Sequence, residues 1–330
     1  MPSRNRHVIA VVVLVPVLAA LALWAFAWPA SRLAPRDLPL GVAGPPAAAA
    51  QAENQLERHE GAFEIHRYAD EAAARDAIED RSVYGAVVVT RQGPELLTAS
   101  AAGPAVAQFL QQAVGQQAAA GGAQIKTVDV APSPASDPRG AVLSAAVLPL
   151  ALAGIAAGAV VTLLGLRGVR AALALLGASV LVGMAAAGIA HSWLGALGGD
   201  WWAEAGVLAL STLAVGGAVA GLAALIGPAG TGIAAAVVML IGNPFSGATS
   251  APRMLPEPAG TIGQWLPPGA GTTLLRSVSF FDGAAAAGPA LTLAWWAALG
   301  LGAVLLGGSL NARKAGTGPA ADRRELSAVG

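Results

Sequence analysis

Long apolar runs separated by short polar stretches make up most of the chain. A helix needs roughly 20 apolar residues to cross about 30 Å of hydrocarbon. Six runs are candidates for such helices, at about residues 8–28, 141–166, 171–190, 205–226, 231–242 and 287–306. The fifth run is short and needs residues on either side to complete a span. The pattern therefore predicts an α-helical membrane protein with six transmembrane helices.

The first apolar run, 8–28, follows the basic sequence RNRH and could be taken for a secretory signal peptide. The apolar core of a signal peptide has about 7–15 residues, however, and this run is longer. We therefore expect an uncleaved anchor, in which residues 1–29 comprise a cytoplasmic N-terminus and transmembrane helix 1.

Between the first two runs the pattern changes to short stretches in which apolar and polar positions alternate. This part of the chain predicts the order β-α-β-α-β-β-α-β. Strands are expected at 38–44, 62–69, 83–90, 95–100 and 123–130, and helices at 47–60, 70–81 and 104–117. Asp70 is placed to cap the second of these helices. Residues 30–140 are thus predicted to form an α/β domain inserted between transmembrane helices 1 and 2.

The stretch NPFSGATSAPRMLPEPAGTIGQWLPPGAGTTLLRS, which begins at Asn243, fits neither of these two patterns. A soluble linker would carry more charge. A spanning helix would not tolerate so many prolines, because each removes a backbone donor and crowds the preceding turn. The segment 243–286 therefore needs a separate structural explanation.

The composition agrees with a membrane protein. Of the 330 residues, 55% are hydrophobic and 12% charged, and the mean hydropathy is +0.62, whereas a soluble domain carries about 25% charged residues. The formal net charge is zero, so no surface for nucleic acid is expected. The absence of cysteine excludes disulfides, thiolate metal sites and a cysteine nucleophile. The high alanine and glycine content, with only two lysines, is associated with bacterial genomes rich in G and C.

Basic residues predict the orientation, because short cytoplasmic loops are enriched in lysine and arginine. Three places between or beyond the apolar runs carry them: Arg4 and Arg6, then Arg167 and Arg170, then Arg313, Lys314, Arg323 and Arg324. With six spans, all three places lie on the same side of the membrane. We therefore expect a multi-pass protein of the bacterial plasma membrane with both termini, including the tail 311–330, in the cytoplasm. Residues 30–140 and 243–286 are then outside.

Candidate chemistry is sparse. No cofactor, metal site or enzyme activity is expected, since GPAGTG at 227–232 lacks the lysine of a phosphate-binding loop and no HExxH or nucleophile elbow is present. His59 and His66 are expected to be surface residues. The centres of the later spans contain no Asp, Glu, Lys or Arg, which disfavours a proton-driven pump. His191 and Glu204, at the outer ends of two spans, are expected to be solvated.

Taken together, the layout of anchor, outer α/β domain and five further spans resembles the membrane subunits of type-2 ABC exporters, the ABC-2 permease class. The similarity is greatest to the branch related to phage infection protein. Two stretches carry the resemblance: YADEAAARDAIEDRSVYGAVVV at 68–89, and the NPFSG…LP segment at 242–283. The resemblance implies that the five-helix domain 141–310 works as a homo- or heterodimer among membrane lipids, with ATP hydrolysed by a separate ATPase subunit.

The resemblance also implies a role for the proline-rich segment, as a re-entrant or interfacial cap on the outer face. Non-helical backbone at membrane depth is tolerated only where protein or a wet cavity surrounds it. The expected cap residues are Asn243, Pro244, Pro256, Trp265, Pro267 and Pro268, and the prolines are expected to break any continuous helix. Arg253, Arg276 and Asp282 are expected to be interfacial anchors. An ordinary exposed loop is the alternative.

One departure from the family concerns the partner. Type-2 permeases dock their ATPase through a charged helix between the second and third spans, where this chain has only LRGVR. Arg167 and Arg170 are therefore the expected cytoplasmic partner contacts. The leading hypothesis is an exporter permease for a hydrophobic or amphipathic molecule. The alternative is an envelope scaffold or receptor-like protein that does not transport, whose outer domain binds a partner.

Overall fold

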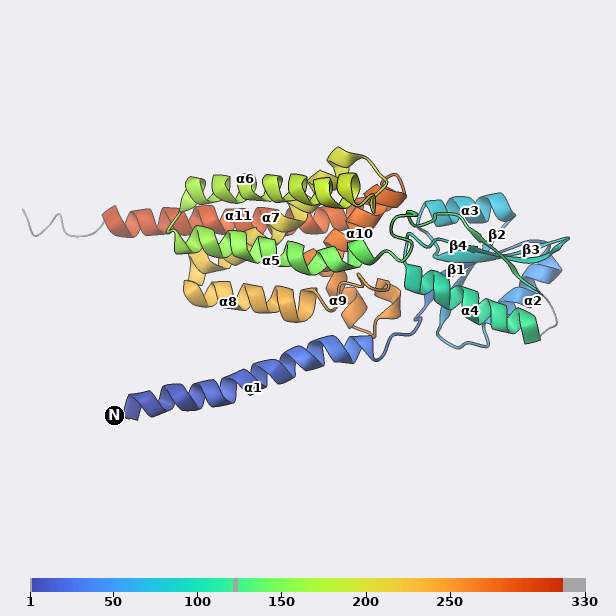
Figure 1. Cartoon of the computed structure of the whole chain (residues 1–330), viewed down its shortest axis with the longest axis horizontal. Helices are drawn as coiled ribbons and strands as arrows, with labels where there is room; N and C mark the ends of the chain where they lie inside the picture. Colours follow the sequence, from blue (N-terminus) through green and yellow to red (C-terminus); the bar gives the residue numbers. More distant parts are fainter. Residues whose placement is uncertain (1, 121–123, 317–330) are drawn as a thin grey trace, which may run out of the picture.

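The computed structural model describes residues 2–120 and 124–316. An elongated molecule has a helical body at one end and a smaller lobe built on a sheet at the other (Figure 1). In the described part of the chain, five helices are long and apolar enough to cross a membrane. They are α1 (Pro2–Ala30), α5 (Ala141–Leu163), α6 (Gly168–Ala187) continued by the π-helical turn η1 (Gly188–Trp193), α7 (Trp201–Ile226) and α11 (Ala287–Gly316).

The fifth apolar run of the sequence forms a shorter helix. It consists of α8 (Pro228–Val237) and the π-helical turn η2 (Val238–Gly242), which together fall below the length of a span. The structure therefore shows a mostly helical protein with several candidate membrane-spanning helices, five of them complete.

Helix α7 forms the centre of the helical body, with α5, α6, α8, α10 and α11 packed around it. Half of its apolar window is buried, compared with 6% for α1. Glycines allow the close approach, because a side chain at Gly300 of α11 would overlap the backbone of Gly217. On the other side, Gly158 of α5 leaves room for the Gly216 carbonyl of α7. This is the small-residue packing expected between membrane helices.

Between α1 and α5 the chain forms the lobe, which we call the sheet lobe (residues 38–129). Its elements follow the predicted order. They are β1 (Leu38–Ala43), α2 (Pro46–Leu56), β2 (Phe63–Tyr68), α3 (Glu71–Glu79), β3 (Gly85–Thr90), β4 (Gly93–Thr98), α4 (Pro104–Ala120) and β5 (Lys126–Asp129). The sheet order is β2-β1-β3-β4-β5, antiparallel only between β3 and β4. Asp70 caps α3 as predicted, its Oδ1 accepting the Ala73 N–H at 2.9 Å.

The segment 243–286, which we call the outer segment, contains three short helices. These are the 3₁₀ turn η3 (Pro252–Met254), α9 (Ala259–Trp265) and α10 (Pro267–Phe280). The outer segment lies at the end of the helical body nearest the sheet lobe (Figure 1), and its helix α10 packs against α7 and α11. The beginning of α1, the α5–α6 turn and the end of α11 lie at the opposite end of the body.

Candidate functional site

The outer segment is the candidate site, because it contacts both the helices of the body and the sheet lobe. The prolines interrupt the helix as predicted, since η2 ends at Gly242 and the chain next resumes a longer helix at Pro267. Pro267 and Pro268 do not keep the backbone irregular, however. They occupy the first turn of α10, where a missing backbone N–H costs nothing.

The remaining predicted cap residues have different environments. Asn243 and Pro244 are half-buried directly after η2, and Pro256 is buried. Trp265 ends α9 and is 73% exposed, while its carbonyl accepts the indole N–H of Trp296 at 2.8 Å. An exposed indole tied to α11 by its backbone is well placed for a membrane interface.

The outer segment is folded back on itself by specific polar contacts. Gln264 donates to the Ser246 carbonyl at 3.2 Å and accepts from the Thr273 hydroxyl at 2.6 Å. Gly263 has no room for a side chain, because one would overlap the Phe245 carbonyl. These contacts distinguish the segment from an ordinary exposed loop.

Arg276 is the most heavily buried cation of the segment, and the expectation that it anchors at an interface is wrong. Its side chain is 4% exposed. The guanidinium donates to the carbonyls of Gly247 at 3.3 Å and Ala248 at 2.6 Å. Ala248 also accepts from the Ser144 hydroxyl of α5 at 2.9 Å. Arg276 therefore connects α10 with the start of the outer segment and, through Ala248, with α5. The two carbonyls take the place of the water that would otherwise solvate the guanidinium.

Arg276 has no acidic partner within the described residues, where the ion pairs involve other side chains. By contrast, Arg253 and Asp282 are exposed. Sequence reasoning missed the burial of Arg276. The signal available was its position in α10, three residues before Ser279 and four after Thr272.

The sheet lobe is fastened to the outer segment on both faces of its sheet. On one face, Ala251 and Met254 join the core that includes Leu38 and Val106. On the other face, Phe281 joins the core that includes Ile78. The lobe and the outer segment thus share their hydrophobic cores, which makes independent movement costly.

Polar contacts reinforce this junction. Arg81 donates to the Thr273 carbonyl at 3.0 Å, and its guanidinium lies 5.3 Å from the ring centre of Phe281, within the range of a cation–π contact. Burial lowers the pKa of Arg81, and burial raises the pKa of nearby Tyr84. Arg36, before β1, donates to the Met254 carbonyl at 3.0 Å.

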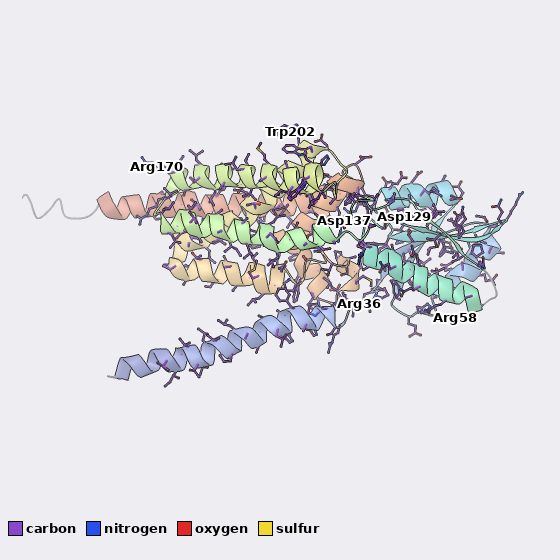
Figure 2. All side chains as sticks on the ribbon, viewed as in Figure 1. Arg36, Arg58, Asp129, Asp137, Arg170 and Trp202 are labelled. Carbon is purple, nitrogen blue, oxygen red and sulfur yellow. The ribbon has the colours of Figure 1, made fainter. Side chains whose placement is uncertain are left out.

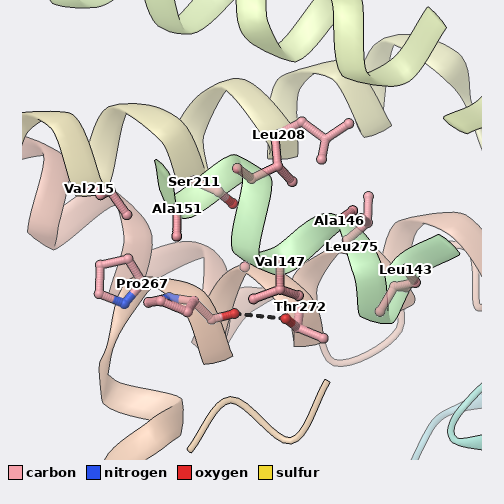
Figure 3. A pocket seen from close by; sticks show the side chains of 13 residues that line it. Leu143, Ala146, Val147, Ala151, Leu208, Ser211, Val215, Pro267, Thr272 and Leu275 are labelled. Carbon is pink, nitrogen blue, oxygen red and sulfur yellow. Dashed lines mark hydrogen bonds between the residues drawn. The ribbon is translucent and has the colours of Figure 1, made fainter. Parts of the chain in front are cut away.

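A small cavity lies where α5, α7 and α10 meet (Figure 3). Its volume is about 40 Å³, enough for a few water molecules only. The wall is apolar except for Ser211 and Thr272, whose hydroxyls donate to carbonyls of their own helices at 2.8 Å. At this junction, α5, α7 and α10 therefore leave no room for a larger molecule in this conformation.

A second buried ionisable group corrects another expectation. Glu204 is not solvated, because its side chain is completely buried in the first turn of α7. One carboxylate oxygen lies 2.8 Å from His191 Nδ1 of η1, and the other accepts the Gly199 N–H at 3.0 Å. His191 is 29% exposed. The sequence signal for this burial was the position of Glu204, an acid inside an apolar run four residues after Asp200.

Arg167 and Arg170 are exposed in the α5–α6 turn and at the start of α6. Arg170 lies at the end of the helical body away from the sheet lobe, whereas Arg58 is in the lobe (Figure 2). These predicted partner contacts are thus at the opposite end of the helical body from the outer segment. In the described part of the chain, no group of histidines and acids could hold a metal ion.

Comparison with protein families, characterised proteins and solved structures gives no match to this chain. The interpretation of the site therefore depends on its geometry. The arrangement offers an interrupted apolar helix whose outer part is bound to a lobe outside the helical body.

Proposed function

We propose that this chain is the membrane permease subunit of an ABC-2-type exporter. It moves a hydrophobic or amphipathic molecule out of a bacterial cell, and a separate ATPase subunit hydrolyses ATP. In this proposal the protein lies in the plasma membrane as a homo- or heterodimer. The sheet lobe is extracytoplasmic, and both termini are cytoplasmic.

One observation carries the proposal, namely the interruption between η2 and α10. Gly242 lies against Pro268, since a side chain at Gly242 would be 2.9 Å from the proline ring. The apolar helix α8–η2 is too short to span alone, but α10 continues from its end toward the sheet lobe (Figure 1). Together they supply the sixth crossing. Broken helices of this kind line the transport pathways of membrane transporters.

The ends of the molecule support the proposed orientation. The exposed arginines of the α5–α6 turn lie at one end and the sheet lobe at the other. Arginine-rich short loops remain in the cytoplasm. The sheet lobe then lies outside, and the α5–α6 turn faces the cytoplasmic ATPase.

The small cavity beside α10 supports a mechanism that requires movement. A molecule larger than a few waters can pass between α5, α7 and α10 only when α10 separates from the other two helices. Because the outer segment shares its cores with the sheet lobe, displacement of α10 moves the lobe as well. ATP hydrolysis at the cytoplasmic end would thus be coupled to the outer face through the helical body.

The test is copurification of the full chain with an ATPase from the membranes of its own host. We expect an ATPase to be retained and its hydrolysis to rise when a transported molecule is added. The double substitution Arg167→Glu and Arg170→Glu should weaken this association by at least about tenfold, as expected for loss of two charges at an interface. Arg139→Glu is the matched control, because Arg139 is exposed before α5 at the lobe end.

Loss of the ATPase in the Arg139 variant as well would contradict the proposed docking surface. Recovery of the intact chain without any ATPase would contradict the exporter function. That second result would favour the scaffold hypothesis, for which the shared cores of the sheet lobe and outer segment supply a rigid outer surface.

A further inference from the structure

Three arginines meet where the chain passes from α1 into the sheet lobe. Arg32 and Arg36 lie in the linker between α1 and β1, and Arg253 is in η3. Backbone groups hold the three together. The Arg36 N–H donates to the Arg253 carbonyl at 3.0 Å, and the Arg36 guanidinium donates to the Arg32 carbonyl at 2.9 Å. Figure 2 shows Arg36 at the lobe-side end of α1. We call these three residues the arginine site.

The guanidinium of Arg36 is fixed in position, yet part of it is unused. Its Nη1 donates to the carbonyls of Ala34 and Met254, each at 3.0 Å, and its Nη2 donates to that of Arg32. Three of its five N–H groups are therefore occupied. The Nε–H and one Nη2–H have no acceptor among the described residues. A half-buried guanidinium with free donors in a fixed place suits an anion with several oxygens, such as a phosphate.

The positive charge of the arginine site is not balanced by acids. Arg32 and Arg253 are exposed, and the ion pairs among the described residues include no member of the site. The acids nearest in the sequence, Asp37 and Glu257, are exposed and are also outside those pairs. Glu257 instead accepts from the Thr261 hydroxyl at 3.2 Å. Because arginine keeps its charge in proteins, the site attracts an anion at any physiological pH.

The depth of the arginine site identifies the source of the anion. The apolar part of α1 runs from Val8 to Ala30. Near its end Trp24 and Trp28 stack with 5.6 Å between ring centres, and indoles favour the headgroup layer of a membrane. Arg32 follows Trp28 by four residues, or about 6 Å at the helical rise. The headgroup layer is about 5–7 Å thick on each side of the hydrocarbon. The arginine site is therefore level with the phosphates of the lipids.

Lipid can reach the arginine site because α1 lies apart from the helical body along most of its length. Only 6% of its apolar window is buried, and Figure 1 shows α1 diverging from α8 away from the sheet lobe. Leu21 and Leu23, near the lobe-side end, are 48% and 71% exposed. A phospholipid beside α1 would thus contact these leucines with its chains and the arginines with its phosphate.

We propose that the arginine site binds the phosphate of an anionic phospholipid whose chains lie beside α1. The bound headgroup would connect α1 to η3, which belongs to the core of the sheet lobe through Met254. It would thereby fix a helix that has few other contacts with the protein. The proposal requires that α1 lies in a membrane, but it does not depend on the exporter function. Binding is therefore measured without an ATPase.

The test titrates the full chain in detergent with dioleoyl phosphatidylglycerol or dioleoyl phosphatidylcholine and measures bound lipid by native mass spectrometry. We expect the anionic lipid to bind at least about fivefold more tightly, the scale of one arginine beside an anionic surface. Equal affinity for the two lipids would overturn the proposal. Inorganic phosphate and a hexaglutamate peptide are added as competitors at the same concentration as the lipid. Displacement of phosphatidylglycerol by the phosphate would indicate a site for free anions, and displacement by the peptide a site for an acidic protein. Either result would overturn the assignment to lipid.

Matched variants separate the arginine site from general charge. Arg32→Gln with Arg253→Gln should weaken binding of phosphatidylglycerol by at least about tenfold, for the loss of two charges. Arg58→Gln with Arg91→Gln is the control, because it removes two charges from exposed positions of the sheet lobe, and Arg58 lies away from α1 (Figure 2). Arg36→Lys keeps the charge but loses the planar fork of donors, and should weaken binding about threefold to tenfold. Full affinity in the first double variant, or an equal loss in the control, would overturn the proposal.

Hydrogen exchange locates the bound lipid. Phosphatidylglycerol should slow exchange in 31–37 and 252–255, and the Arg32 and Arg253 double variant should lose this protection. Exchange that stays unchanged there while the lipid binds would place the lipid elsewhere and overturn the proposal. Each variant must first show the Tm of the unsubstituted chain without added lipid. If Arg36→Lys does not fold, the double variant decides, because the side chains of Arg32 and Arg253 make no hydrogen bond within the described residues. Absence of a copurified ATPase would count against the exporter function and leave this result unaffected.

Discussion

Helices α1 and α7 are both long enough to cross a membrane, yet their environments are opposite. Only 6% of the apolar window of α1 is buried, against 50% for α7. Helix α1 touches the rest of the body near its lobe-side end, where Trp28 lies 6.1 Å from Phe245 between ring centres. Helix α7 contacts nearly every other helix of the body.

The difference shows what determines the place of a membrane helix. Lipid is as apolar as leucine, so large apolar side chains do not drive a helix into the protein interior. The large side chains of α1, such as Leu14, remain outward. Helix α7 is central because glycines such as Gly217 let its neighbours approach.

The largest effect is expected from filling the contact between α7 and α11. Gly300→Val would place a side chain into the backbone of Gly217 and separate the two helices. Overpacking costs about 1–3 kcal/mol where side chains can shift, and the loss here should be larger because the added side chain meets the Gly217 backbone. Gly302→Val is the matched control two residues along the same helix, where a side chain meets open space. The Tm of both variants is measured by thermal unfolding in detergent. Equal Tm values would show that the close contact of Gly300 with α7 does not stabilise the protein.

A smaller loss is expected at the junction of α10 with the start of the outer segment. Arg276→Leu leaves the Gly247 carbonyl without this donor, and an unsatisfied buried group costs about 1–3 kcal/mol. Hydrogen exchange should accelerate in 243–281 before it does in α7. Arg253→Leu, at an exposed position, should leave exchange unchanged. Equal protection in the two variants would show that Arg276 does not hold the segment.

A weaker effect is expected where the sheet lobe meets α10. Arg81→Gln removes the hydrogen bond to Thr273 and the contact with Phe281, a loss of about 1 kcal/mol. The lobe should then become more sensitive to limited proteolysis at its junction with the body. Arg91→Gln, in the exposed β3–β4 turn, is the control. If the Arg91 variant is as sensitive to proteolysis as the Arg81 variant, the contacts of Arg81 do not stabilise the junction.

The smallest effect is expected on α1. Leu14 is 55% exposed, so Leu14→Ala should change the free energy of unfolding by less than about 0.5 kcal/mol. Leu208→Ala, at a 3% exposed position of α7, should cost several times more, since buried leucine truncations cost about 2–5 kcal/mol. Similar losses at the two positions would mean that α1 packs against a partner in the membrane.

Much of the fold follows from local patterns. The alternating stretches predicted the order of the sheet lobe, and Asp70 predicted a helix start, because both signals depend on neighbours in the sequence. The fifth apolar run was also recognised as short. The split of this region into α8–η2 and α10 was not foreseen, because prolines signal an interruption without showing where a helix resumes.

The buried charges could not be placed from the sequence. The partners of Arg276 are the backbone carbonyls of Gly247 and Ala248. Every residue has a backbone carbonyl, so no side-chain pattern in the sequence marks these two as partners. Glu204 and His191 are thirteen residues apart, and only the turn after η1 brings them together. Long-range pairs of this kind depend on the tertiary structure.

The central claim is that the sheet lobe and the α5–α6 turn lie on opposite sides of the membrane. The chain has no cysteine, so single cysteines report their own positions. Gln92→Cys lies in an exposed turn of the lobe, and Leu164→Cys lies in the α5–α6 turn, where Leu164 is 70% exposed. In intact cells, a maleimide that cannot cross membranes should label Gln92→Cys and reach Leu164→Cys only after permeabilisation. Labelling of both positions in intact cells, or the reverse pattern, would contradict the account.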